Sequence, residues 1–264
     1  LPFYGLAILC TDDPGVREIL GRIGRAVLSY GIDESADVRA ENIRYDGGVT
    51  RFDVVRSDAE PLAVELKLPG RHNVQNALAA IAVARELSIS DAAVVRALEK
   101  FEGIDRRFQA LGEIATVNGR VMIVDDYGHH PTELRATLKA ARTGWPDRRL
   151  VLVFQPHRYT RTRDLLDDFA QVLSETDVLI LLDVYAAGEA PIAGADGRAV
   201  ARAVRSRGAV EPVFVETLDE LEPVLTSLLA DGDLLLTMGA GDIGAYAQTL
   251  PDRLAAKPGL KVQT

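Results

Sequence analysis

The second half of the chain alternates short apolar runs with amphipathic stretches, and this alternation restricts the possible folds more than any other feature. The apolar runs are "RVMIVDDY", "RLVLVFQP", "DVLILLDVYA", "EPVFVE" and "DLLLTMGA". The stretches between them include "PTELRATLKAAR", "TRDLLDDFAQVLSE", "GRAVARAVRSRG" and "LDELEPVLTSLLAD", and their apolar residues have helical spacing. Strands that are apolar on both faces and separated by helices predict a parallel sheet covered by helices on both sides. We therefore expect residues 107–264 to form one α/β domain.

Residues 1–106 have a different pattern. Two alternating runs flank "DGG" in "DVRAENIRYDGGVTRFDVVR", which predicts a β-hairpin. Two helical stretches follow, "NVQNALAAIAVARELS" and "SDAAVVRALEKF", and Ser90 or Asp91 is the expected N-cap of the second. The segment "GIDRR" then has the character of a linker. The chain is therefore expected to hold two domains, residues 1–106 and 107–264.

Composition excludes several classes of function. A formal net charge of -9 argues against a general nucleic-acid or membrane-surface binder, which needs a basic face. No apolar run approaches the roughly 18–20 residues of a membrane span. Cys10 is the single cysteine, so the chain has no internal disulfide and no multi-cysteine metal site, which suits a reducing cytoplasm. The chain begins with Leu1 directly before a strand-like run, and we expect it to be a piece of a longer protein.

The expected strands end in polar residues of types that bind ligands or take part in catalysis. Three of them run into "IVDDYGHH", "VFQPHRYTR" and "LTMGAGD", and a fourth runs into "LDVYAAGEAPI". In open parallel sheets, ligands bind beyond the carboxyl ends of the strands. The sequence therefore predicts a functional site at that edge of the second sheet.

The densest group of cations follows the run "LVLVF" and contains His157, Arg158, Arg161 and Arg163. Cations at the start of a helix oppose its dipole, so an anionic ligand is needed to offset their repulsion. The planar guanidinium of arginine suits the oxygens of a carboxylate or phosphate. Arg163 has the alternative of a surface ion pair, because aspartates follow it directly.

The segment "DDYGHHP" places Asp125, Asp126, Tyr127, His129 and His130 on one strand-to-helix turn. Carboxylates, imidazoles and a phenol in one turn make a plausible acid–base or ligand set. The aspartates have the alternative of capping local backbone groups. A metal site with two histidines has less support, because the helical spacing and a clear third ligand are absent.

The segment "LPGRHNVQNALA" brings His72, Asn73 and Asn76 to the start of a helix, where Asn73 has the alternative of a simple cap. The chain has four histidines, and all of them lie in the three motifs described so far. That distribution favours a functional role for the motifs.

The segment "GAGDIG", residues 239–244, matches the pattern G-x-G-x-x-G of dinucleotide-binding folds. The match follows the last expected strand instead of the first, and no acidic residue on a next strand lies about 20 positions later. A tight turn or close strand–helix packing is therefore the preferred interpretation, and a dinucleotide-dependent oxidoreductase is the alternative. No phosphate loop of the form G-x-x-x-x-G-K-[ST] occurs in the chain.

Taken in order, these motifs resemble the signature blocks of the Mur ligase family. The blocks are "GRHNVQNALAA", "GIDRRFQ", "VDDYGHHPTE", "FQPHRYTRTRDL", "AGEAPIAGAD" and "GAGDI". The resemblance implies that residues 1–106 are the latter part of a central ATP-binding α/β domain and residues 107–264 a complete C-terminal Rossmann-like domain. It also implies that the UDP-sugar domain and the segment with the phosphate loop lie outside this chain, which should then be inactive alone.

The activity implied by the resemblance is ATP-dependent amide formation in peptidoglycan precursor synthesis, in the bacterial cytoplasm. L-alanine would be joined to UDP-N-acetylmuramate through an acyl phosphate, with Mg²⁺ held mainly by residues outside this chain. A family member that joins a tripeptide to the same nucleotide sugar is the first alternative. A second alternative is that the chain is a non-catalytic binding module. The resemblance implies no oligomeric state.

The resemblance also implies roles for particular residues. Those expected to bind ATP are His72, Asn73 and Asn76 on the adenine side, Arg107 at the phosphates and Asp126 at the ribose. Those expected to line the alanine and acyl-phosphate site are Tyr127, His129, Arg158 and Arg161. His130 and His157 would orient their neighbours, and no metal ligand is expected in this chain.

Overall fold

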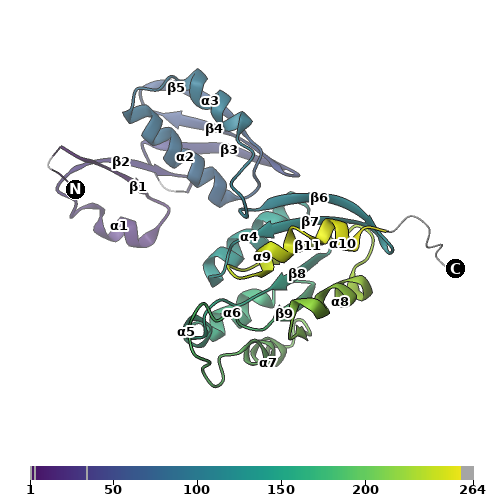
Figure 1. Cartoon of the computed structure of the whole chain (residues 1–264). Helices are drawn as coiled ribbons and strands as arrows, with labels where there is room; N and C mark the ends of the chain where they lie inside the picture. Colours follow the sequence, from purple (N-terminus) through teal and green to yellow (C-terminus); the bar gives the residue numbers. More distant parts are fainter. Residues whose placement is uncertain (1, 3, 34, 257–264) are drawn as a thin grey trace. The chain divides into compact units, whose positions relative to one another are not determined.

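The computed structural model describes residues 2, 4–33 and 35–256 (Figure 1). The chain divides into two compact units, Leu1–Gly103 and Ile104–Thr264. Each unit has its own sheet and its own hydrophobic core. No helix in the described part of the chain is long and apolar enough to cross a membrane.

The first unit is built on a mixed five-stranded sheet with the order β1-β2-β3-β4-β5. Its strands are β1 (Leu6–Cys10), β2 (Ala26–Gly31), β3 (Val38–Asp46), β4 (Val49–Arg56) and β5 (Ala59–Leu66). Strands β1, β2 and β3 pair in parallel, whereas β3, β4 and β5 pair antiparallel. The hairpin predicted around "DGG" is confirmed as β3–β4, and Gly47 supplies the left-handed turn residue with φ of 57°.

The helices of the first unit are α1 (Pro14–Leu20), α2 (Arg71–Glu86) and α3 (Asp91–Lys100). Helix α2 buries Val74, Leu78 and Ile81, which recur at helical spacing and join the core formed by the sheet. Ser90 is the N-cap of α3, but its side chain makes no capping hydrogen bond.

The second unit contains a six-stranded sheet with the order β10-β9-β8-β11-β7-β6. Its strands are β6 (Gln109–Thr116), β7 (Gly119–Asp126), β8 (Leu150–Phe154), β9 (Val178–Leu182), β10 (Val213–Val215) and β11 (Leu234–Met238). All neighbouring pairs are parallel except β6–β7. The predicted parallel α/β fold is confirmed, and the antiparallel edge strand β6 was not anticipated. Strand β6 is half-exposed and contains a break in register at Gly112, so its pattern lacks the continuous apolar run of the central strands.

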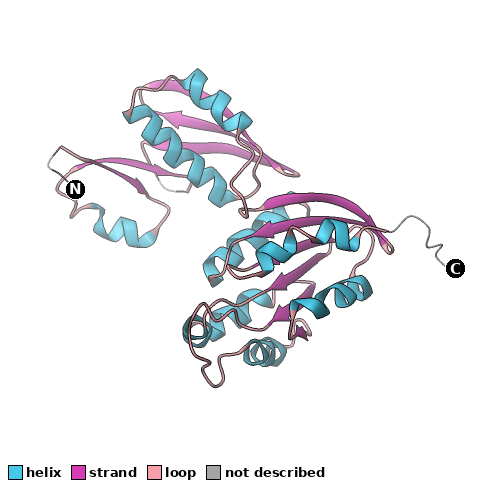
Figure 2. Cartoon of the chain, in the orientation of Figure 1, coloured by secondary structure: helices cyan, strands magenta, loops and turns pink. Residues whose placement is uncertain are grey.

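Helices cover both faces of this sheet (Figure 2). They are α4 (Pro131–Gly144), α5 (Tyr159–Asp164), α6 (Leu166–Leu173), α7 (Gly197–Arg207), the 3₁₀ turn η1 (Leu218–Glu220), α8 (Leu221–Leu228), α9 (Ile243–Ala247) and α10 (Leu250–Leu254). The helix expected over "TRDLLDDFAQVLSE" is divided at Leu165 into α5 and α6. The division lets both Leu165 and Leu166 pack against the core.

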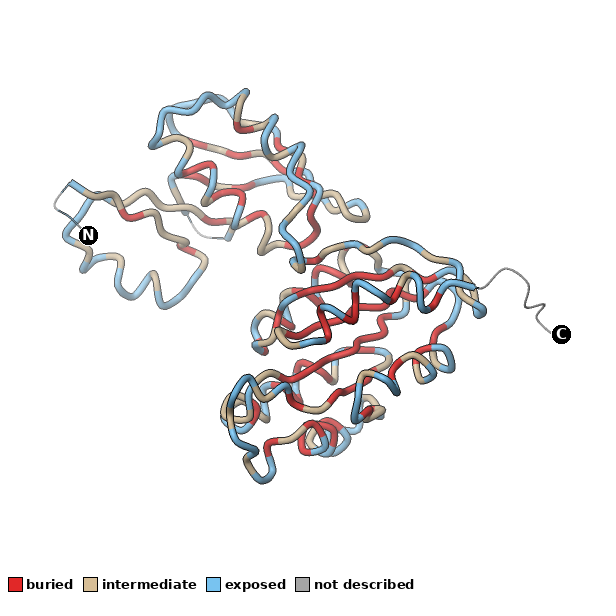
Figure 3. Tube along the Cα trace, viewed as in Figure 1, coloured by how far each residue is buried: buried red, intermediate tan, exposed pale blue. Residues whose placement is uncertain are grey.

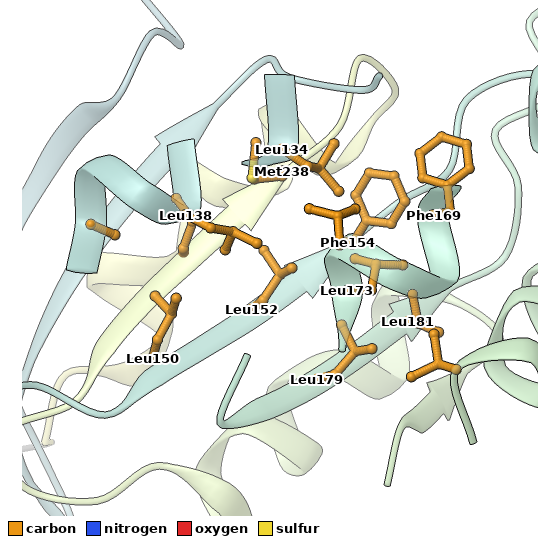
Figure 4. Packing of buried hydrophobic residues seen from close by; sticks show 14 of the residues in the cluster. Leu134, Leu138, Leu150, Leu152, Phe154, Phe169, Leu173, Leu179, Leu181 and Met238 are labelled. Carbon is orange, nitrogen blue, oxygen red and sulfur yellow. The ribbon is translucent and has the colours of Figure 1, made fainter. Parts of the chain in front are cut away.

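Strands β8 and β11 are buried along their whole length, and β9 from its second residue on (Figure 3), because each face of the sheet has its own core. Alternate residues of β8 divide between the two cores, with Leu152 and Phe154 on one face and Val151 and Val153 on the other. On the first face, the strand residues pack with side chains from α4 and α6 (Figure 4) and also with side chains from α7. The second face packs with α8, α9 and α10.

The strand order decides where the polar motifs lie. Strands β9, β8, β11 and β7 are consecutive neighbours and all run in the same direction. Their carboxyl ends therefore form one continuous edge, from which the segments after Leu182, Phe154, Met238 and Asp126 emerge.

Candidate functional site

A row of aromatic and imidazole rings lies along this edge. The ring of Tyr127 meets that of His129 edge-on at 5.3 Å between centroids, and His129 lies 5.6 Å from His157. His157 in turn stacks on Tyr185 at 5.5 Å. Segments that follow three different strands thus place their side chains side by side, and Tyr185 was not among the predicted site residues. Tyr185 lies in the segment "LDVYAAGEAPI", which follows one of the expected strands and was the only sequence signal for it.

Asp126 holds the turn that carries Tyr127. One carboxylate oxygen accepts from the backbone N–H of Gly128 at 2.7 Å and the other from that of Phe108 at 2.8 Å. Burial raises the pKa of Asp126 in spite of these two donors. The carboxylate therefore has a structural role in the turn, in agreement with the capping alternative recognised for the aspartates.

His130 begins helix α4 as its N-cap. Its Nδ1 accepts from the N–H of Thr132 at 3.3 Å, while the carboxylate of Glu133 accepts from the N–H groups of His129 and His130. This is a capping box, followed by Pro131 at the first helical position as expected. Burial acts to raise the pKa of Glu133, but the amide donors and His129 outweigh it, so the pKa is lowered.

The three arginines after β8 have different surroundings. Arg163 pairs with Asp164 at 2.8 Å on the surface. Arg161 donates to the carbonyl of His157 at 3.1 Å and approaches its Nδ1 at 3.3 Å. Arg158 is exposed, and within residues 4–33 and 35–256 no carboxylate lies at ion-pair distance from its guanidinium. Arg158 is therefore the member of the cluster whose charge is available to a ligand.

Arg158 is held by its backbone in a left-handed conformation, with φ of 73°. Its N–H donates to the carbonyl of Tyr185 at 2.9 Å, and its own carbonyl accepts from the N–H and hydroxyl of Thr162. Glu189 secures the same helix start, because its carboxylate accepts from the N–H of Thr160 at 3.0 Å and from the hydroxyl at 2.7 Å. Glu189, within "AGEAPI", was not predicted as a site residue.

Two further polar residues at this edge were missed. Arg106 donates through Nε to the buried carboxylate of Asp125 at 2.9 Å and through Nη2 to the carbonyl of Gly239. Gln155 donates to Asp242 at 2.6 Å and accepts from the N–H of Ile243 at 3.2 Å. Three of these contacts join residues 87 or more positions apart, and the fourth joins Arg106 to Asp125, which lies 19 positions later. No local pattern indicates them.

The glycines of "GAGDIG" make room for these residues. A methyl group on Gly239 would press against Gln155, one on Gly241 would overlap Gln155 and Tyr185, and one on Gly244 would overlap the guanidinium of Arg106. The segment is thus a tight turn closely packed on its neighbours, which was the preferred interpretation. Dinucleotide binding is not needed to explain its glycines.

The remaining predicted residues of the second unit lie nearby or on the surface. Arg107 is exposed, with its guanidinium 5.6 Å from the ring centroid of Tyr127 and 4.0 Å from the carboxylate of Glu133. Within the described residues, no group of three or more His, Cys, Asp and Glu side chains is arranged to hold a metal ion. The residues present therefore do not fit a Mg²⁺ site.

In the first unit, the predicted nucleotide residues lie on the first turns of α2. Gly70 is the N-cap, so Asn73 is not; its amide donates instead to the carbonyl of Pro69 at 2.8 Å. Asn76 reaches the Asn73 side chain at 3.5 Å, and His72 is half-buried beside them.

The start of α2 is tied to the sheet by Asp12. The carboxylate of Asp12 accepts from Gln75 at 2.6 Å and from the N–H of Ile32 at 2.9 Å, and it lies 3.3 Å from the guanidinium of Arg71. The helix turn with the predicted nucleotide residues is therefore anchored to the ends of β1 and β2.

Comparison with known proteins agrees with this architecture. Residues 1–84 match the model for the Mur ligase middle domain, and residues 106–241 match that for the Mur ligase, glutamate ligase domain. The UDP-N-acetylmuramate–L-alanine ligase of Methylococcus capsulatus is 57% identical over 257 residues, which are 97% of this chain and 54% of that protein. The chain thus spans about half the length of this curated relative.

Solved structures of similar proteins have the same architecture. The UDP-N-acetylmuramate–alanine ligase of Thermotoga maritima has 30% identity and a TM-score of 0.69, over 85% of this chain and 47% of that one. The murein peptide ligase of Psychrobacter arcticus has the same fold, with 24% identity and a TM-score of 0.68 over 98% of this chain and 53% of that one. Two models of one family match successive parts of the sequence, and a close relative aligns along nearly all of it: the chain belongs to the Mur ligase family.

Proposed function

We propose that the protein containing this chain joins L-alanine to UDP-N-acetylmuramate at the expense of ATP, in cytoplasmic peptidoglycan precursor synthesis. The observation that carries the proposal is the 57% identity, over 97% of this chain, with a UDP-N-acetylmuramate–L-alanine ligase. The carboxylate of the sugar would be activated as an acyl phosphate, which the amine of alanine attacks with loss of phosphate. This chemistry requires charge neutralisation at the transferring oxygens and accurate placement of the amine.

In this proposal, residues 1–106 form the latter part of the ATP-binding domain and residues 107–264 the C-terminal ligase domain. His72, Asn73 and Asn76 contact the adenine side of ATP from the start of α2. Arg107 reaches the phosphates with its exposed side chain. Asp126 faces the ribose while its carboxylate also holds two backbone N–H groups.

The amino acid and the acyl phosphate lie at the row of rings. Arg158 binds an anionic group, either the alanine carboxylate or the phosphate, because its charge has no carboxylate partner at ion-pair distance in the described part of the chain. Arg161 supplies a second positive charge beside it. Tyr127 and His129 line the site. Nδ1 of His129 lies 3.1 Å from the carbonyl of Tyr127, to which only a protonated Nδ1 can donate.

That arrangement gives His129 a definite chemical capability. With its proton on Nδ1, the neutral ring presents the lone pair of Nε2, which can accept a proton from the attacking ammonium group. His130 and His157 orient their neighbours, His130 by capping α4 and His157 by its contact with Arg161. Mg²⁺ is held by residues other than those described, and no role is assigned to it at this edge.

The proposal is tested by measuring phosphate release with ATP, Mg²⁺, UDP-N-acetylmuramate and L-alanine. The assay compares this chain with a protein of the relatives' full length that contains it. Alanine-dependent release by the longer protein alone is the expected result, because the chain has no phosphate-loop motif. Release only when a tripeptide replaces alanine would assign the protein to the peptide-adding alternative. Absence of release with every acceptor would refute the proposal.

A further inference from the structure

We propose that Arg106 is a positioning residue that fixes the ring of Tyr127 at the edge of the sheet, and this inference rests on the proposed function of that edge. Arg106 belongs to the second unit, which begins at Ile104, and it precedes strand β6 in the segment first interpreted as a linker. Nothing in its local sequence distinguishes it from Arg107. Both guanidinium groups lie near the Tyr127 ring, but the side chain of Arg106 is mostly buried whereas that of Arg107 is exposed.

The guanidinium of Arg106 is anchored on two sides. Its Nε donates to Asp125 at 2.9 Å, and its Nη2 donates to the carbonyl of Gly239. The Asp125 side chain is fully buried, and its other oxygen accepts from the hydroxyl of Thr237 at 2.7 Å. A buried carboxylate with a fixed partner on each oxygen leaves the arginine little freedom to rotate.

The backbone of Arg106 is equally constrained. Its φ of 60° is unfavourable for a residue with a side chain and persists only when the surrounding contacts impose it. The N–H of Arg106 donates to the side chain of Gln109 at 2.9 Å, and its carbonyl accepts from the N–H of Tyr127 at 2.6 Å. The hydrogen bond to Tyr127 connects Arg106 directly to the predicted site.

Tyr127 is 38% exposed, so the core does not hold its ring. Arg106 does: its guanidinium carbon lies 5.1 Å from the ring centroid, within the range of a cation–π contact. His129 touches the same ring edge-on. An exposed ring placed between an anchored guanidinium and an imidazole keeps one orientation relative to the rest of the site.

The chain makes space for this arrangement at a position distant in the sequence. Gly244 lies where any side chain would overlap the guanidinium of Arg106. The space needed by Arg106 therefore explains why the last residue of "GAGDIG" is a glycine. The first glycine of this segment, Gly239, also contacts Arg106, because its carbonyl accepts a hydrogen bond from the same side chain.

Arg106 does not bind the anion itself. Its charge is neutralised by Asp125, and two of its nitrogen donors are engaged by protein acceptors. In the described part of the chain, by contrast, no carboxylate lies at ion-pair distance from the guanidinium of Arg158. Arg106 therefore acts through Tyr127, and its loss should affect binding of the acceptor amino acid more than binding of ATP.

The chain offers a closely matched control. Arg149 donates through Nε and Nη2 to the buried carboxylate of Asp233, at 2.9 and 2.8 Å. These two residues precede β8 and β11, so the pair lies at the opposite edge of the same sheet. Replacement by lysine keeps the charge but loses the two-pronged geometry at either place.

The experiment uses the full-length ligase with Arg106→Lys, Arg149→Lys, Tyr127→Leu and the double variant Arg106→Lys/Tyr127→Leu. We expect Arg106→Lys to raise the KM for alanine by about tenfold and the KM for ATP by less than about twofold. Arg149→Lys should leave both unchanged. In the double variant, the effect of Arg106→Lys on the KM for alanine should disappear, because the ring through which it acts is absent. Additive effects, or an equal rise in Arg149→Lys, would overturn the proposal.

A second readout does not depend on turnover. With fluorotyrosine incorporated, the ¹⁹F signal of Tyr127, assigned by its loss in Tyr127→Phe, should shift or broaden in Arg106→Lys and stay in place in Arg149→Lys. An unchanged signal in Arg106→Lys would refute the positioning role even in an inactive protein. If the wild-type protein turned over no acceptor, the proposed function would be refuted, but the positioning role of Arg106 would not.

Discussion

The guanidinium of Arg161 lies 3.3 Å from Nδ1 of His157 and 3.1 Å from its carbonyl oxygen. Arginine can only donate, so Nδ1 is the acceptor and the proton of the neutral ring is on Nε2. Burial, followed by the neighbouring His129, Arg161 and Arg158, lowers the pKa of His157. A neutral ring thus holds Arg161 in place, and protonation would replace this hydrogen bond with repulsion.

This relationship predicts a pH dependence of stability. Because the pKa of His157 is lower in the folded state, the unfolded state takes up the proton first as the pH falls below about 6.5. The contribution of His157 to stability is therefore complete above that pH and is lost as the pH falls toward the folded-state pKa. Urea unfolding at about pH 7.5 and about pH 5.5 should show a smaller loss in His157→Gln than in the wild type. Equal losses would contradict the assignment.

The cation cluster predicts a ranking of arginine substitutions in the full-length ligase. Hydrogen bonds to charged groups are worth about 1.5–3 kcal/mol, so Arg158→Ala should lower kcat/KM for alanine roughly ten- to hundredfold. Arg163→Ala should change it less than about twofold, because Arg163 forms an exposed pair with Asp164. Steady-state kinetics of both variants checks the ranking. Comparable losses would show that the two charges are equivalent and would undo the assignment of Arg158.

Gly244 should not tolerate alanine. The added methyl group would displace Arg106 from the buried Asp125, and breaking such a pair costs about 3–5 kcal/mol against roughly 1 kcal/mol gained by alanine in a helix. We expect a net loss of about 2–4 kcal/mol in the free energy of unfolding. Gly21→Ala is the control, since no heavy atom of its surroundings among the described residues lies within 4 Å of the added group. A stable Gly244→Ala variant would mean that Arg106 can leave its position freely.

The first unit contains an ion pair that should matter for its stability. The buried guanidinium of Arg56 donates to both oxygens of Asp91, at 2.7 and 2.8 Å, and these bonds lower the pKa of Asp91. Asp91→Asn should cost about 1–2 kcal/mol, less than a fully buried pair, because the Asp91 side chain is 48% exposed. Asp46→Asn, in a loose surface pair with Arg51, should change the unfolding free energy by less than about 0.5 kcal/mol. Chemical denaturation measures both, and equal effects would contradict the prediction.

Much of this architecture could be predicted from local sequence. The near-continuous apolar runs of β8, β9 and β11 indicate strands buried on both faces, and the helical spacing between them requires crossovers. The "DGG" turn identifies the β3–β4 hairpin in the same way. These features are local because burial repeats with the period of each element, which any short window reveals.

The roles of individual polar residues were harder to predict from the sequence. His130 belongs to a run of ring residues but serves as a helix cap. Arg106 lies in a segment first interpreted as a linker, yet it contacts a carbonyl 133 positions away. Strand β6 was missed because an edge strand exposed on one side has no continuous apolar run.

Local sequence predicts the buried strands and most of the helices, and it indicates at which end of the strands the polar residues collect. The position of β11 between β8 and β7, which brings the glycine turn after β11 to Gln155 and Arg106, follows from the tertiary structure alone. Burial is encoded residue by residue, whereas the partner of a side chain depends on how distant segments are brought together.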